Sequence, residues 1–291
     1  MFELSIPETV VFALIVALHA TAAAVAIVQV LRRGRRTRWS VVSLIAAAVF
    51  LDGVLLALRA ASIRAVPLTG LFESLILLAL VLGVLYVGLS FVVEQVWFGS
   101  MMVWLIFGMV MAAVFVAGPA ARPHAVAAMP WSFAHAGAMI LAAGSIIFAA
   151  AASILYLLSS YRLKHKQIMR VLGRVPNMET LAMMNRIGLG LGFVLLTIGL
   201  VSGLGRVPLL GTSVVAWLKD GKVLCVLAAW GLLAGILIWD RFFLLKAKVR
   251  AYATLAAFAL ILLATVGVTV AGVTRHRFSL RHSSVPEVHT A

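Results

Sequence analysis

Long apolar runs, separated by short polar or basic stretches, dominate the chain. The runs are continuous and do not alternate with polar residues, and each approaches the roughly 20 residues that a helix needs to cross a bilayer. Because only helices and closed barrels satisfy their backbone hydrogen bonds in lipid, continuous runs predict helices. The eight expected spans cover 10–31, 39–58, 71–93, 97–117, 131–158, 183–204, 223–245 and 251–273.

Composition agrees with this pattern and excludes an ordinary soluble globule. Of 291 residues, 64% are hydrophobic and only 11% are charged, whereas soluble domains are roughly half apolar and a quarter charged. We therefore expect an all-α, polytopic transmembrane helix bundle, with one domain over 1–281 and a short external polar tail over 282–291. The single cysteine, Cys225, excludes an internal disulfide and a CxxCH haem-attachment motif.

Basic residues indicate how the spans are oriented. They concentrate in the connections after the first, fifth and seventh spans, and the positive-inside rule places such connections in the cytoplasm. Both termini are then expected on the external, periplasmic side of a bacterial inner membrane. The net charge of +15 is explained by this orientation and by anionic membrane lipid, so we expect no nucleic-acid partner. The three basic connections contain Arg32, Arg33, Arg35, Arg36 and Arg38; Arg162, Lys164, Lys166, Arg170 and Arg174; and Arg241, Lys246, Lys248 and Arg250.

Glycines recur at helical spacing in the sixth span. Gly188 and Gly192 lie four residues apart, as do Gly199 and Gly203. Small residues at this spacing let two helix backbones approach closely in a membrane. We expect this face of the sixth span to pack against a neighbouring helix.

Ionisable side chains inside spans are costly and are therefore candidate functional groups. His19 and Asp52 fall at similar depth in the first two spans, so they form a candidate intramembrane polar pair. Glu73 enters the third span near its outer end, where it could meet Arg59 or Arg64. The alternative is that each is a packing residue whose polar atoms are satisfied by neighbouring helices.

Two histidines are expected at the external ends of separate spans. His135 follows Trp131 by four residues, which puts both on one face of the fifth helix. His276 lies just after the eighth span, next to Arg275. Two imidazoles at equal depth can ligate one haem iron, and interfacial arginines can pair with its propionates. Alternatively, both histidines face lipid headgroups.

The connection over 205–221 is expected on the same external side of the membrane as these two histidines. It contains Arg206, Trp217, Lys219 and Asp220, and Lys222 follows it. An aromatic surface beside several cations suits a planar anionic ligand, although a lone interfacial tryptophan also serves as a membrane anchor.

Taken together, these positions resemble the cytochrome c assembly family of integral membrane proteins, the group that contains the CcsA, CcmC and HemX-type proteins. The likeness extends over most of the chain and rests on the order and spacing of several short motifs. These are Pro67-Leu68-Thr69-Gly70-Leu71-Phe72-Glu73-Ser74-Leu75, Trp131 with His135, Tyr161-Arg162-Leu163-Lys164, Asn185-Arg186 with Gly192-Phe193, Leu195-Leu196-Thr197-Ile198-Gly199, Trp217 with Asp220-Gly221-Lys222, Trp230, and the segment from Gly267 to His276 with Phe278-Ser279.

The resemblance implies that haem b is handled at the external face, beneath a tryptophan-containing loop and between two histidine ligands. Carried over to this chain, the iron ligands are His135 and His276, and the loop contributes Trp217 and Asp220. Arg206 or Arg275 would then lie near a propionate.

The chain departs from the family pattern in that loop. The fuller motif has several tryptophans before a Trp-Asp-Pro-Lys-Glu run, whereas here Gly221 stands in place of the proline and Val223 in place of the glutamate. This difference points to the smaller HemX-like branch.

Three functions remain open from the sequence. The first is a haem-binding protein of cytochrome c maturation, with apocytochrome c and other maturation membrane subunits as partners. The second is a transporter or proton-translocating subunit that uses His19 and Asp52. The third is a haem-free regulatory or assembly subunit. No nucleophile–base constellation is visible, so the sequence leaves open whether the protein is an enzyme.

Overall fold

A computed structural model describes the chain over 4–32, 38–63, 70–91, 96–116, 130–165, 177–207, 213–243 and 245–264. Within these ranges the protein is helical and contains no strand. The helices are α1 (Ile6–Arg32), α2 (Arg38–Ile63), α3 (Leu71–Ser90), α4 (Val96–Val116), α5 (Pro130–Lys164), α6 (Met178–Arg206), α7 (Val214–Leu218), α8 (Gly221–Phe243) and α9 (Ala247–Leu262).

Seven of the described helices, α1 to α6 and α8, are long and apolar enough to cross a membrane. The protein is therefore a multi-pass membrane protein, as its sequence pattern predicts. Helix α9 covers the first part of the expected eighth span, whose remainder over 265–273 lies outside the described residues. Helix α5 continues beyond the expected end at 158 to Lys164, because an apolar window cannot detect a helix that extends past the hydrocarbon into polar sequence.

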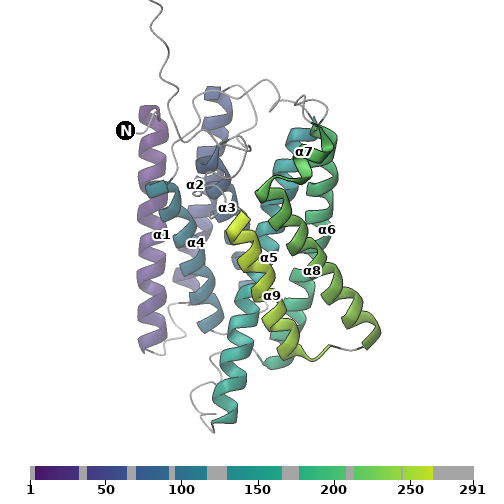
Figure 1. Cartoon of the computed structure of the whole chain (residues 1–291). Coiled ribbons are helices and arrows are strands. Elements are labelled where there is room, and N and C mark those ends of the chain that lie inside the picture. The colour runs from purple at the N-terminus through teal and green to yellow at the C-terminus, as the bar shows by residue number, and fades with distance from the viewer. Residues whose placement is uncertain are drawn as a thin grey trace, which may run out of the picture.

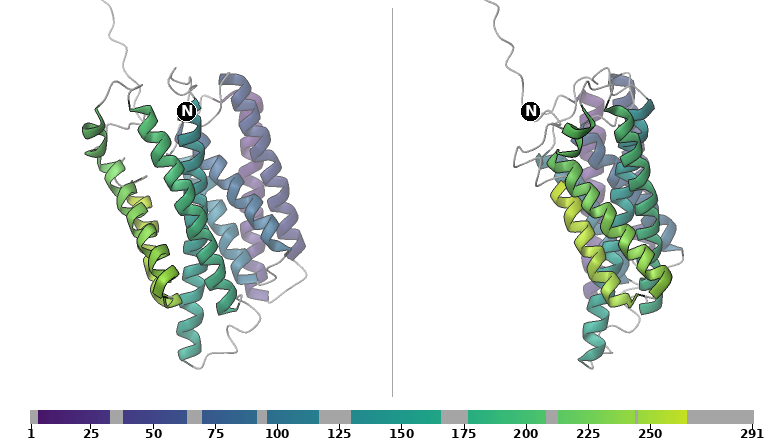
Figure 2. Two further views of the ribbon diagram at one scale, coloured as in Figure 1. Left: turned by 90° about the vertical axis from the view of Figure 1, so that its right-hand side faces the viewer. Right: turned by 45° about the vertical axis from the view of Figure 1, so that its right-hand side comes forward.

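The helices form two packed groups with α5 between them (Figure 1). Helices α1 to α4 pack on one another, and α3 and α4 also contact α5; on its other side α5 packs against α6 and α9. Two further views show α8 and α9 layered beside α5 and α6 (Figure 2). The most apolar part of α5 is mostly buried, whereas the corresponding parts of the other spans leave the larger share of their residues at the surface.

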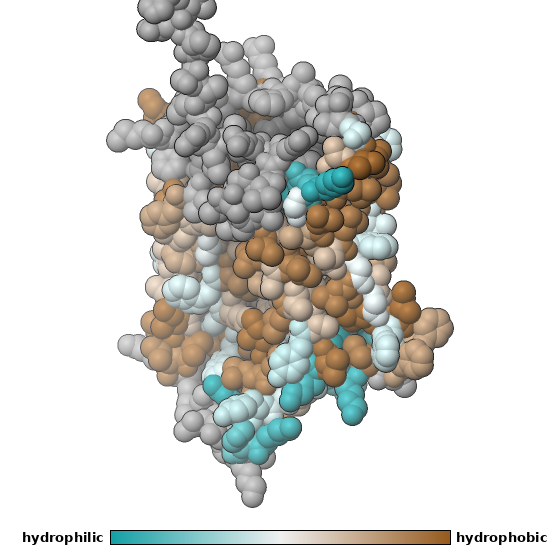
Figure 3. Space-filling view, in the orientation of Figure 1, coloured by the Kyte–Doolittle hydropathy of each residue, from teal (hydrophilic) through white to brown (hydrophobic). Residues whose placement is uncertain are grey.

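The outer surface matches a lipid environment. Phe50, Val201 and Ile238 are 70%, 61% and 59% exposed, and apolar side chains cover much of the middle of the molecule in Figure 3. Contiguous apolar exposure on this scale would promote aggregation in water but is the normal lipid-facing surface of a membrane helix.

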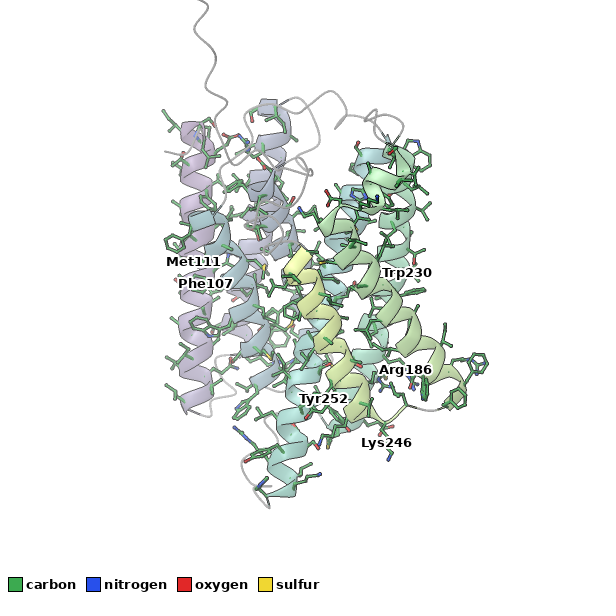
Figure 4. The ribbon with its side chains drawn as sticks, in the orientation of Figure 1. Phe107, Met111, Arg186, Trp230, Lys246 and Tyr252 are labelled. Carbon is green, nitrogen blue, oxygen red and sulfur yellow. The ribbon has the colours of Figure 1, made fainter. Side chains whose placement is uncertain are left out.

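In the second helix group, which comprises α6, α8 and α9, a buried polar network around Arg250 connects the three helices. Its guanidinium donates to Asp240 Oδ1 of α8 at 2.9 Å, to Asn185 Oδ1 of α6 at 3.1 Å and to the Ala182 carbonyl at 3.2 Å. Arg186, labelled in Figure 4, contacts the other oxygen of Asp240 at 2.8 Å. The carboxylate is thus held between two guanidinium groups.

The amide of Asn185 extends the same network to α5 and α9. It donates to Ser153 Oγ of α5 and to Thr254 Oγ1 of α9, each at 2.8 Å. Hydrogen bonds between helices stabilise membrane bundles because lipid offers no competing partner. The sequence-based expectation that Arg250 lies in the connection between two spans is wrong: it occupies the first turn of α9 and is only 5% exposed.

We predict that Asp240→Asn destabilises the protein by about 3 to 5 kcal/mol, because it leaves the buried Arg250 charge uncompensated. Thermal unfolding can be followed through Cys225, which is partly buried, with a thiol-reactive dye that fluoresces on reaction. Arg186→Gln is the matched control: Arg186 is 56% exposed, so its ion pair is screened and its removal should cost less than about 1 kcal/mol. Equal destabilisation by the two variants would contradict this account of the network.

Candidate functional site

Helices α5 and α6 pack closely because the glycines of α6 leave room for the side chains of α5. A Cβ atom added at Gly188 would lie 2.9 Å from Ala149 Cβ, and one at Gly192 would lie 2.7 Å from Ile146 Cγ1. At Gly199 it would lie 2.6 Å from Met139 Sδ. Such distances leave no room for a side chain, so the expectation that these glycines face a neighbouring helix is confirmed, and the neighbour is α5.

Because α5 and α6 run antiparallel, two further residues of α5 lie beside the C-terminal end of α6. One turn beyond Met139, the ring of His135 lies against Gly203, and one turn beyond that, Trp131 lies against Gly205. The sequence places Trp131 and His135 on one face of α5. In the structure this face packs against the glycines near the end of α6. Trp131 remains 51% exposed at the edge of the bundle.

His135 is held by the backbone of α6. Its Nδ1 lies 2.7 Å from the carbonyl oxygen of Gly199. A carbonyl only accepts hydrogen bonds, so Nδ1 carries the proton, and the neutral ring then has its lone pair at Nε2. A histidine whose ring is oriented through one nitrogen while the other holds a lone pair has the arrangement seen in metal-ligating histidines.

Trp217 and His135 both lie against Gly203. A Cβ added at Gly203 would be 3.0 Å from His135 Cε1 and 3.6 Å from Trp217 Cζ2, so both rings converge there. Trp217 belongs to α7, a short helix at the upper end of the molecule in Figure 1. Ser213 begins α7 by accepting a hydrogen bond from the Ala216 amide at 3.2 Å.

Asp220 fixes the turn from α7 into α8. Its Oδ1 accepts a hydrogen bond from the Lys222 amide at 2.9 Å, and its own amide donates to the Trp217 carbonyl at 3.1 Å. A carboxylate in this place caps the free amides at the start of a helix. The side chain is buried, with 8% exposure. The sequence marks Asp220 as a ligand-facing residue but does not reveal this capping contact.

For three other residues of the site that the sequence predicts, the structure describes no side chain. Arg206 ends α6, and its side chain lies outside the description. Arg275 and His276 lie outside the described residues altogether. The part of the site that the structure describes is thus formed by His135, Trp217 and the α6 glycines.

The polar residues of the first helix group, α1 to α4, make contacts apart from this site. His19 Nε2 lies 3.8 Å from Asp52 Oδ2, and both side chains are fully buried. Toward the N-terminal end of α1, Arg59 donates to Glu73 at 2.7 Å and lies 3.8 Å from Glu8. Of the two arginines that the sequence offers as partners of Glu73, Arg59 contacts it, and Glu8 is a further partner that the sequence pattern does not indicate.

Comparison with known proteins assigns the chain to a family. The family model described as "Cytochrome C assembly protein" matches residues 68–276, which include α3 to α9 and the whole surface around His135. A search of curated proteins gave no significant match. Since the family model covers well over half of the chain, the protein belongs to the cytochrome c assembly protein family and has a role in cytochrome c maturation.

Proposed function

We propose that the protein binds haem b at the end of the bundle where α5, α6 and α7 meet, and that it presents this haem during cytochrome c maturation. The observation that carries the proposal is the hydrogen bond from His135 Nδ1 to the Gly199 carbonyl, 2.7 Å long. It sets the tautomer and the ring orientation that an iron ligand requires.

The described residues fit haem in two further respects. Trp217 offers a flat aromatic surface next to His135, and such a surface can lie against a porphyrin ring. The capping contacts of Asp220 hold the α7–α8 turn, and with it Trp217, in place. We therefore assign Asp220 a positioning role in the cofactor site.

The remaining partners of the haem come from the family resemblance. His276 would be the second iron ligand, and Arg206 or Arg275 would pair with a propionate. When bound, haem b would supply the vinyl groups that react with apocytochrome c thiols. The contribution of this chain is to hold and orient the cofactor, which lowers the entropic cost of bringing the two reactants together.

The basic connections support an outward-facing site. The α1 and α5 C-terminal ends and the α8–α9 connection lie at one end of the molecule, opposite α7 (Figure 1). With that basic end in the cytoplasm, the haem site faces outward from a bacterial inner membrane. We propose eight spans with both termini outside, a HemX-like branch, and assembly with other cytochrome c maturation subunits.

We predict that His135→Ala shifts the absorption spectrum of the purified protein from low spin toward high spin, or abolishes haem retention. Removing one of two axial imidazoles leaves a five-coordinate iron, and added imidazole should restore the spectrum by occupying the vacant position. His276→Ala should behave in the same way. Trp217→Ala should weaken haem retention without changing the spin state, because it removes contact area and not a ligand.

A pair of glycine variants separates ligand geometry from general damage to α6. In Gly203→Ala the new methyl would lie 3.0 Å from the His135 ring, whereas at Gly190 nothing lies within 4 Å. The first variant should therefore perturb the haem spectrum and Gly190→Ala should leave it unchanged. Unaltered spectra in both histidine variants and in Gly203→Ala would refute the ligand assignment.

For the topology we predict that cysteines placed at Arg36, Lys164 or Lys248 resist an impermeant maleimide added to spheroplasts, in a Cys225→Ser background. Lys164 and Lys248 are exposed at the basic end of the bundle, so only the membrane should protect them. A cysteine at Val215, which is 62% exposed on α7, is the external control. Labelling of the basic-end sites in sealed spheroplasts would reverse the proposed orientation.

A further inference from the structure

His19 and Asp52 lie midway along the first two helices of the bundle. His19 is thirteen residues from either end of α1, which corresponds to about 20 Å of helix on each side. Both residues have 0% exposure, and the facing atoms Nε2 and Oδ2 are 3.8 Å apart. They also precede residues 68–276, so they lie outside the segment that matches the family.

The hydrogen bonding of this pair is incomplete. His19 Nδ1 lies 2.9 Å from the Ile15 carbonyl and therefore carries a proton. Within the described part of the chain, neither His19 Nε2 nor either oxygen of Asp52 has a hydrogen-bond partner. A fully buried carboxylate without a hydrogen-bond donor costs several kcal/mol. Asp52 is therefore not expected to remain there as an isolated negative charge.

One additional proton resolves the conflict. If it resides on Asp52, the carboxylic acid donates to Nε2; if it resides on His19, the imidazolium donates to the carboxylate. The 3.8 Å separation exceeds a direct hydrogen bond, so the two side chains have to move closer for this bond to form. The proton belongs to the pair in both arrangements.

Other ionisable groups on the packed helices lie away from the pair. Helix α4 has none between Val96 and Val116, and α3 contributes Glu73 and Tyr86 near its opposite ends. Arg59 is seven residues beyond Asp52, about 10 Å along α2, and it is occupied by Glu73 and Glu8. No neighbouring cation among the described residues therefore neutralises Asp52.

We propose that His19 and Asp52 together form a binding site for one exchangeable proton in the middle of the α1–α4 group. The proton is taken from water and returned to water, and only an N–H or O–H bond forms or breaks. The site is independent of the proposed haem site, which lies on α5, α6 and α7.

The test counts protons bound by the full-length protein in detergent across the pH range in which circular dichroism shows it folded. We expect wild type to release one proton per chain more than the double variant His19→Gln/Asp52→Asn, and Asp52→Asn alone to show the same deficit. Ser159→Ala is the matched control, because Ser159 Oγ is also buried without a partner but does not titrate. Equal proton counts in wild type and the double variant would overturn the proposal.

Infrared difference spectra of the wild-type protein give a second readout that does not depend on the variants folding. Acidification should produce either a protonated carboxylic acid band or protonated imidazole bands, with deuterium-sensitive positions. A spectrum with neither change over the folded range would also overturn the proposal.

Discussion

The close approach of α5 and α6 is the constraint on which the rest of this structure depends. Lipid is as apolar as the helix surfaces, so burial from water does not drive helices together, and tight packing has to do so. Glycines at the contact bring the two backbones together, and α5 then supplies a second face to the first helix group. Without this approach the Gly199 carbonyl would not be available to His135. The central helix pair and the candidate site therefore share one physical cause.

Buried polar groups supply the second level of organisation. Arg250, Asp240 and Asn185 connect α6, α8 and α9, and their hydrogen-bonding atoms are matched to one another. The pair of His19 and Asp52 differs, because three of its polar atoms have no described partner. Buried polar groups normally have hydrogen-bond partners, so the unpartnered atoms of His19 and Asp52 are the observation on which the proposed proton site rests.

Much of the fold could be predicted from the sequence, since long apolar runs have one solution in lipid. The helical class, the glycine face of α6 and the meeting of Arg59 with Glu73 all follow from spacing and burial cost. The position of Arg250 did not follow, because a basic residue next to an apolar run looks like a loop residue until Asp240 is seen opposite it. The capping role of Asp220 likewise depends on where α7 ends. Of the site, the sequence identifies His135 and Trp217, and only the packing shows that they meet at Gly203.

The claim that this α5–α7 surface is a haem site is tested most directly by the absorption spectrum and haem content of the wild-type protein, purified in mild detergent from haem-replete cells. We predict about one haem per chain with a low-spin spectrum, because the proposal assigns His135 Nε2 to iron while Nδ1 is held by the Gly199 carbonyl. A folded preparation with no Soret band would contradict it and would leave the convergence of His135 and Trp217 on α6 as a packing feature alone.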